Sequence, residues 1–278
     1  MMRGARIVIT DAFGHFNSDD GWAMASHVAL STLMAVFPFL IFVAALAGFV
    51  GHEALAERVA EILFQAWPSD IAGPIAAEVK RVVGQAHVRL LTIAAVVAVY
   101  LASNGVEATR TALNRAYRVV DRRSFLFRWA QSVVFVIAGA AASLMLAFVV
   151  VLGPAMAERI AAVVPVLAPL EAGSYVGRLA VTALVVVVVL VASHLWLPAG
   201  RPHWPRLWPG IALTLVLWVA EAAILAIYIG RFANLAATYA GLAGVVAAIF
   251  FLYLVAVSLI FGAEFNAALG RLRSGRTG

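Results

Sequence analysis

The 278-residue sequence lacks cysteine altogether and is poor in charge: charged residues make up 12% of it, and Lys80 is the single lysine. Without cysteine, disulfide bridges, thiolate metal sites, iron–sulfur clusters and cysteine nucleophiles are excluded. The scarcity of charge argues against a soluble globular domain, in which about a quarter of the residues are charged. Hydrophobic residues account for 64% of the chain, more than a water-soluble fold can hide. These proportions predict a polytopic membrane protein.

The common catalytic and metal-binding motifs are also absent from the sequence. No two of the six histidines lie three or four residues apart, and none falls in a cluster with Asp or Glu that resembles a zinc or di-iron site. There is no Walker loop, no G-x-S-x-G and no G-x-G-x-x-G. We therefore expect no metal, no cofactor and no catalytic residues of a known type, and an enzyme is not the favoured interpretation.

Six charge-poor segments have the composition of membrane-spanning helices. A helix needs roughly 20 residues to cross about 30 Å of hydrocarbon. The runs are continuously apolar rather than alternating, which favours helices over a barrel. The predicted fold is therefore an all-α polytopic membrane protein, a single membrane domain over residues 1–278 with six transmembrane helices. The predicted spans are residues 28–51, 90–106 (a short one), 129–153, 179–200, 207–230 and 242–265.

Three connecting segments carry structure of their own. Residues 1–20 have apolar positions at near-helical spacing and predict a helix lying on the inner membrane surface. Residues 52–89 show two amphipathic stretches broken by prolines, which predict amphipathic helices on the outer side. Whether these cap the bundle or merely join two spans stays open. Residues 107–128 form a basic inner loop.

The distribution of basic residues orients the spans. With both termini in the cytoplasm, 13 of the 20 basic residues face inward. We therefore expect a multi-pass protein of the bacterial inner (plasma) membrane with both termini cytoplasmic. The sequence does not indicate an oligomeric state.

Polar residues within the spans are candidate functional positions. Glu221 lies near the middle of the fifth span, where a charge costs about 2.5–3.5 kcal/mol, so it should face the bundle interior, a cavity or a partner. It could handle a proton or substrate, or it could be a neutral acid hydrogen-bonded to another helix. Glu264 ends the sixth span and could pair with an arginine or line a vestibule. Pro38 predicts a kink in the first helix, which could line a cavity or only serve packing.

The basic inner loop contains a predicted amphipathic helix. Arg110, Asn114 and Arg118 lie on one helical face, four residues apart. Anionic headgroups attract such segments by about 1 kcal/mol per arginine near the surface. RNA binding and a purely topological role are the alternatives, and a nucleic-acid partner is not expected. The candidate residues for substrate or lipid binding are Glu221, Glu264, Asn266, Asn104, Glu107, Arg110, Asn114, Arg115 and Arg118.

Three stretches of the chain resemble the YihY/BrkB family of bacterial inner-membrane proteins. They are Ala29–Leu40 (ALSTLMAVFPFL), Ser103–Phe125 with its Ala112-Leu113-Asn114-Arg115-Ala116-Tyr117 motif, and Tyr239–Ala267, which ends in Gly262-Ala263-Glu264-Phe265-Asn266-Ala267. One departure is Ala240, where the family commonly shows glycine. The resemblance implies a six-helix inner-membrane protein. Members have carried the label ribonuclease BN, others are named for serum resistance, and a role in moving lipids or envelope precursors has been suggested for relatives.

Three hypotheses of function follow. The first is a transporter or flippase-like protein for an amphiphilic or anionic envelope component, with membrane lipids as partners. The second is a membrane-bound nuclease that processes tRNA, as the older label of the family implies. The third is an envelope assembly protein without turnover. A polar cavity reaching Glu221 would favour the first, a cytoplasmic carboxylate cluster with a metal the second, and a solid bundle the third.

Overall fold

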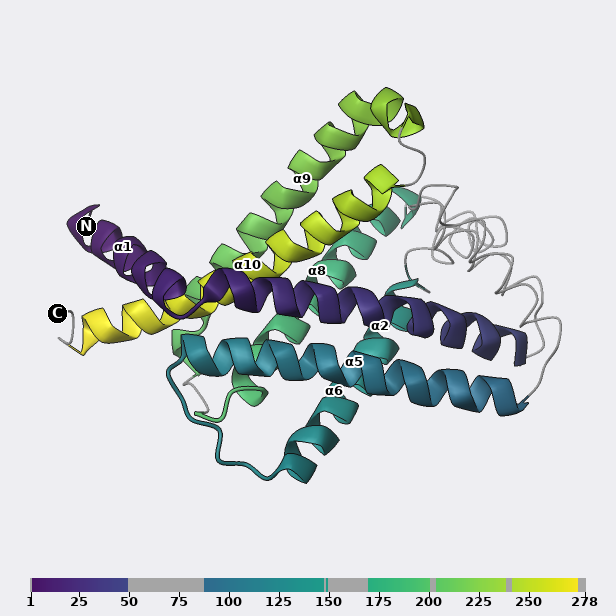
Figure 1. Ribbon diagram of the computed structural model, residues 1–278. Coiled ribbons are helices and arrows are strands. Elements are labelled where there is room, and N and C mark those ends of the chain that lie inside the picture. Colours follow the sequence, from purple (N-terminus) through teal and green to yellow (C-terminus); the bar gives the residue numbers. More distant parts are fainter. Residues whose placement is uncertain are drawn as a thin grey trace.

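The computed structural model describes residues 2–49, 88–147, 149, 170–200, 204–238 and 242–274, and these residues are helical apart from short links. The predicted all-α fold is confirmed for this part of the chain (Figure 1). The elements are α1 Met2–Ser18, α2 Gly21–Phe49, α5 Val88–Ala116, α6 Phe125–Ala147, α8 Leu170–Trp196, the 3-10 helix η3 Trp204–Arg206, α9 Trp208–Thr238 and α10 Leu242–Arg273.

Four of these helices contain stretches long and apolar enough to cross a membrane. The stretches are Phe125–Ser143, Val176–Trp196, Trp208–Ile227 and Val246–Arg273, and they overlap the third to sixth predicted spans. Residues 28–49 of the first predicted span lie in α2, which contains a shorter apolar stretch, and the second predicted span lies within α5. The count of six spans stays a prediction. All but the last two residues of the predicted outer segment 52–89 lie outside the described residues.

Helix α10 is the centre of the packing and contacts α1, α2, α5 and α9. Small residues make this possible, because Ala25, Ala108, Ala112 and Ala256 are all buried in one cluster where α2, α5 and α10 meet. Each alanine allows two helix backbones to approach closely. Figure 1 shows α2 and α5 running side by side, with α1 and the last turns of α10 at the same end of the molecule.

Helix α1 is held against the end of α10 by one apolar face. Val8, Ala12 and Phe16, four residues apart, are buried, and Arg271 of α10 forms an ion pair with Asp11 at 2.8 Å. The expected N-terminal helix is therefore present, and its buried stripe follows the periodicity of the sequence. Its place on the membrane surface stays a prediction.

Helices α9 and α10 run antiparallel and touch through glycine. A Cβ atom built on Gly210 would lie 2.1 Å from the carbonyl oxygen of Gly262, and one built on Gly262 would lie 2.1 Å from Thr214 Oγ1. Only glycine fits at such an approach. These contacts were not predicted from the sequence, although Ser258, Gly262 and Asn266 follow one another at four-residue spacing on one face of α10.

Candidate functional site

One end of the bundle gathers most of the predicted polar candidates, and we call it the arginine-rich end. Here α1, α5, α8 and α10 end, and α2, α6 and α9 begin. The predicted basic inner loop divides at this end: residues 107–116 are the last turns of α5, residues 117–124 are the link, and residues 125–128 begin α6. The predicted basic helix is thus a continuation of α5.

Helix α5 ends in a tight hydrogen-bonded cap. The amide of Val119 donates to the carbonyl of Asn114, and the amide of Arg118 donates to that of Arg115, both at 2.9 Å. This is the Schellman pattern, which requires a left-handed residue after the helix. That residue is Arg118, with φ of 54°. Glycine is the usual occupant, so the arginine is there at a backbone cost of about 1 kcal/mol.

The side chain of Arg118 ties three helices to that cap. Its Nη2 atom lies 2.6 Å from Asp19 in the turn between α1 and α2, and its Nη1 atom lies 3.5 Å from Glu264 of α10. Glu264 is 1% exposed. The pairing predicted for Glu264 is therefore made with an arginine of the basic segment. The ion pairs with Asp19 and Glu264 offset the backbone cost of placing Arg118, rather than glycine, at this left-handed position.

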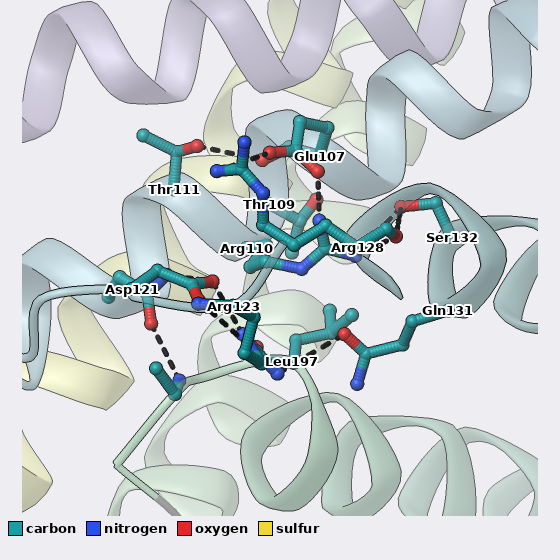
Figure 2. A network of polar contacts seen from close by, with 12 residues as sticks. Glu107, Thr109, Arg110, Thr111, Asp121, Arg123, Arg128, Gln131, Ser132 and Leu197 are labelled. Carbon is teal, nitrogen blue, oxygen red and sulfur yellow. Dashed lines mark hydrogen bonds and ion pairs between the residues drawn. The ribbon is translucent and has the colours of Figure 1, made fainter. Parts of the chain in front are cut away.

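Arg110 is buried between α5 and α6, with only 1% of its surface exposed. Its guanidinium is ion-paired with Glu107 and donates to the carbonyl of Arg128 at 2.9 Å and to Ser132 Oγ at 2.8 Å (Figure 2). Burial lowers the pKa of Arg110 and the nearby Glu107 carboxylate opposes this shift. Arg110 therefore joins two helices and does not present its charge to solvent.

A second network joins α5, the link and the end of α8. Asp121 accepts hydrogen bonds from the backbone and side chain of Arg123, with the shortest at 2.6 Å, and these bonds lower the pKa of Asp121 to about 2. Arg123 also donates to the carbonyl of Leu197 at 2.6 Å (Figure 2). Asn114 donates to Asp121 and accepts from the amide of Ala199. The link is thus held on both sides by charge-assisted bonds.

Asn266 of α10 caps the first turn of α9. Its Oδ1 atom accepts from the amide of Gly210 at 2.7 Å, and its Nδ2 atom donates to the carbonyl of Leu207 at 2.9 Å. The first amides of a helix have no partner within the helix, so a side chain from elsewhere can satisfy them. Asn266 is buried. The structure therefore places this candidate in the junction of two helices.

Glu221 lies apart from the arginine-rich end, farther along α9. Its Oε1 atom accepts a hydrogen bond from the hydroxyl of Ser258 on α10. Its Oε2 atom is buried, with no hydrogen-bond partner within the described part of the chain. The carboxyl group therefore points into the contact between α9 and α10, as the sequence predicted for a residue that avoids lipid.

An open groove of about 440 Å³ lies where α5 meets the link and α6. It is lined by Glu107, Thr111, Asn114, Arg115, Arg118, Val119, Val120, Asp121 and Arg128. Four of the predicted candidates, Glu107, Asn114, Arg115 and Arg118, thus come together in one site. Arg110 is not a lining residue, but it contacts Glu107 and Arg128, which are.

Two of the three arginines of the groove, Arg115 and Arg128, are held loosely by their acidic neighbours, whereas Arg118 is engaged by Asp19 and Glu264. Arg115 lies 3.3 Å from Asp20, and Arg128 lies 3.5 Å from Glu107. Such long, partly exposed pairs contribute little and are screened by salt. An anion with several oxygens could therefore bind these guanidinium groups, which suit phosphate and carboxylate geometry.

The groove also has an apolar part, because Val119 and Val120 line it and Val120 is 80% exposed. Phe125 and Leu126, at the start of the helix that carries Arg128, are also largely exposed. A surface that combines arginines with exposed apolar groups fits an amphiphile better than a simple ion. The sequence pattern did not identify Arg128 as part of this site, because it lies 10 residues after Arg118 and 13 after Arg115, on the next helix.

The remaining candidates lie elsewhere. Asn104 is exposed on α5, and Pro38 lies inside α2 with a half-buried side chain. Within the described ranges there is no group of three or more His, Asp or Glu side chains that could hold a metal ion.

The helices, their apolar surfaces and the polar end identify the class: the chain is a multi-pass helical membrane protein. It belongs to the family described as "Virulence factor BrkB", whose sequence profile matches residues 12–277. The resemblance to the YihY/BrkB family is thereby confirmed. A relative of 25% identity over 273 residues is the ribonuclease-like protein YfkH of Bacillus subtilis (strain 168), and the match covers 94% of each chain. No solved structure matches the chain.

Proposed function

We propose that the protein is a transporter or flippase-like protein for an amphiphilic, anionic component of the cell envelope. The observation that carries the proposal is the groove at the arginine-rich end, where Arg115, Arg118 and Arg128 converge beside exposed apolar side chains. The guanidinium groups would bind an anionic headgroup, since arginine forms paired bonds to phosphate oxygens. Val120 and the start of α6 would contact the apolar part of the same molecule.

The proposal includes the orientation in the membrane. The arginine-rich end would face the cytoplasm of a bacterium, with both termini on that side of the inner membrane, since most basic residues gather there. Anionic lipids of the inner leaflet would then be the partners of the groove. Reporter fusions after Gly278 and within residues 52–89 test this orientation. A C-terminal reporter that is active only outside the cytoplasm would contradict it.

A binding experiment tests the groove. Purified protein is titrated with a short-chain phosphatidylglycerol and, separately, with the matching phosphatidylcholine. We expect the anionic lipid to bind more tightly and its affinity to fall with added salt. The double variant Arg115→Gln/Arg128→Gln should lose about 30-fold in affinity, because each arginine contributes about 1 kcal/mol. Arg273→Gln, at the exposed end of α10, is the matched control and should bind like the unchanged protein.

A transport experiment tests the turnover. The protein is reconstituted in phosphatidylcholine and phosphatidylglycerol vesicles, and the appearance of labelled phosphatidylglycerol in the opposite leaflet is followed. Faster movement than in protein-free vesicles, reduced by the double variant, supports the proposal. Equal binding by the double variant, or no movement above the protein-free rate, contradicts it.

The nuclease alternative is tested with the same protein, because YfkH carries a ribonuclease-like name. If the protein is a nuclease whose groove binds a nucleic-acid backbone, incubation with a precursor tRNA should produce cleavage. Cleavage that disappears in the double variant would replace the transport proposal by the nuclease. Lipid binding without movement would replace it by the assembly role.

A further inference from the structure

Helices α9 and α10 share a line of polar contacts that leads away from the arginine-rich end into the apolar part of the bundle. It begins with Asn266 at the start of α9. It continues with Thr214, whose hydroxyl donates to the carbonyl of Ser258 at 3.2 Å, and with Trp218, whose indole donates to the carbonyl of Val255 at 3.0 Å. It ends at Glu221, which accepts from the hydroxyl of Ser258.

Glu221 lies deep along α9. It follows Trp208, the first residue of the helix, by 13 positions, which corresponds to about 20 Å at 1.5 Å per residue. The stretch Trp208–Ile227 around it is long and apolar enough to span a membrane. An ionised carboxylate at this depth is expensive unless it is compensated by a partner.

The described neighbours of Glu221 offer no such charge. Among the described residues, α10 presents the Ser258 hydroxyl, and no charged side chain interacts with the carboxyl group. Helix α8, which also packs against α9, carries the buried His194, whose Nδ1 atom is hydrogen-bonded to the carbonyl of Leu190 in its own helix. The neutral acid is the form that fits these neighbours, since a proton on Oε2 removes a charge that no described side chain balances.

The groups around Glu221 suit a bound proton better than a bound metal cation. Bound cations need several oxygen ligands, and transporters supply them from broken helices with free backbone carbonyls. Helices α9 and α10 are continuous around Glu221 and Ser258, so their carbonyls accept the bonds of the helices, and those of Val255 and Ser258 also accept from Trp218 and Thr214. Within the described residues, the side-chain oxygens joined by hydrogen bonding at this point are Glu221 Oε1 and the hydroxyl of Ser258, and Glu221 Oε2 has no partner.

We propose that Glu221 and Ser258 form a proton-binding site within the membrane-spanning part of the bundle. The carboxyl group of Glu221 takes up and releases the proton, and Ser258 holds its Oε1 atom in the contact between α9 and α10. This inference deepens the proposed transport function by naming a proton as its coupling ion. The site is separate from the groove, so either can fail in experiment without the other.

Labelling with a membrane-soluble carbodiimide tests the site without any transport assay. The reagent adds the O–H of a protonated carboxyl group across one C=N bond, and the adduct rearranges to a stable N-acylurea with no leaving group. The protein in phosphatidylcholine vesicles is treated over a range of pH, and the modified peptide is identified by mass spectrometry. Detergent-unfolded protein is the control for detection of the Glu221 peptide.

We expect labelling of Glu221 in the folded protein, a loss of labelling as the pH rises, and no labelling in Glu221→Gln. The matched variant Glu264→Gln, which makes the same change at the arginine-rich end of α10, should leave the labelling of Glu221 intact. Failure to label Glu221 in folded protein, when the unfolded protein is labelled there, would overturn the proposal. So would suppression of labelling when sodium chloride replaces choline chloride, because the site would then bind a metal cation.

Discussion

Replacement of Asn266 by alanine should destabilise the protein through the first turn of α9. The change removes the acceptor of the Gly210 amide and the donor to the Leu207 carbonyl, bonds of 2.7 and 2.9 Å in a buried junction. The amide is left unsatisfied, at about 1–3 kcal/mol. The Leu207 carbonyl keeps a second partner, the amide of Ile211 at 3.0 Å, so its loss is about 1 kcal/mol. The expected total is about 2–4 kcal/mol.

Thermal unfolding in detergent measures this effect, and the expected drop in Tm is about 5–10 °C. Asn104→Ala is the control, because it makes the same chemical change at an exposed position of α5. Asn266→Asp keeps the acceptor for the Gly210 amide, close to the positive end of the α9 dipole, and should lose less than Asn266→Ala. The reasoning is refuted if Asn266→Ala unfolds at the temperature of Asn104→Ala. Loss of lipid binding with unchanged stability would instead make Asn266 a binding residue.

Two further substitutions test the packing and the polar networks. Gly210→Ala should prevent normal assembly of α9 with α10, because its Cβ would lie 2.1 Å from the Gly262 oxygen, and poor yield of folded protein in size-exclusion chromatography is the readout. Gly14→Ala has open space around it and should stabilise α1 by about 0.5–1 kcal/mol, so equal behaviour of the two variants would contradict the close contact. Asp121→Asn should lower stability at neutral pH by removing the partner of Arg123. Because the pKa of Asp121 is lowered to about 2, its contribution is complete above about pH 4 and is lost as the pH falls towards 2, so the stabilities of Asp121→Asn and the unchanged protein should converge there.

The candidate site was predictable in part. The spacing of Asn114 and Arg118 predicted both on one helix face, and both line the groove, but α5 ends at Ala116 and Arg118 lies in the left-handed cap beyond it. The same spacing grouped Arg110 with them, although its side chain is enclosed between α5 and α6. Periodicity locates residues around a helix axis, but it does not indicate which helix packs against that face. The burial of Arg110 depends on Ser132, a residue of α6 that no local pattern links to it.

The sequence by itself determined that this protein lies in a lipid bilayer and that its secondary structure is helical. Every backbone group must be hydrogen-bonded in lipid, which helices and closed barrels achieve, and the continuously apolar rather than alternating runs of this chain select helices. A single acid in such a run, Glu221, had to turn away from lipid for the same energetic reason. Only the tertiary structure decided which groups meet. Ser258 faces Glu221, Asn266 caps α9 and Arg128 completes the groove because side chains distant in sequence are brought together by helix packing, and the identity of a packing partner is not encoded in the periodicity of either helix alone.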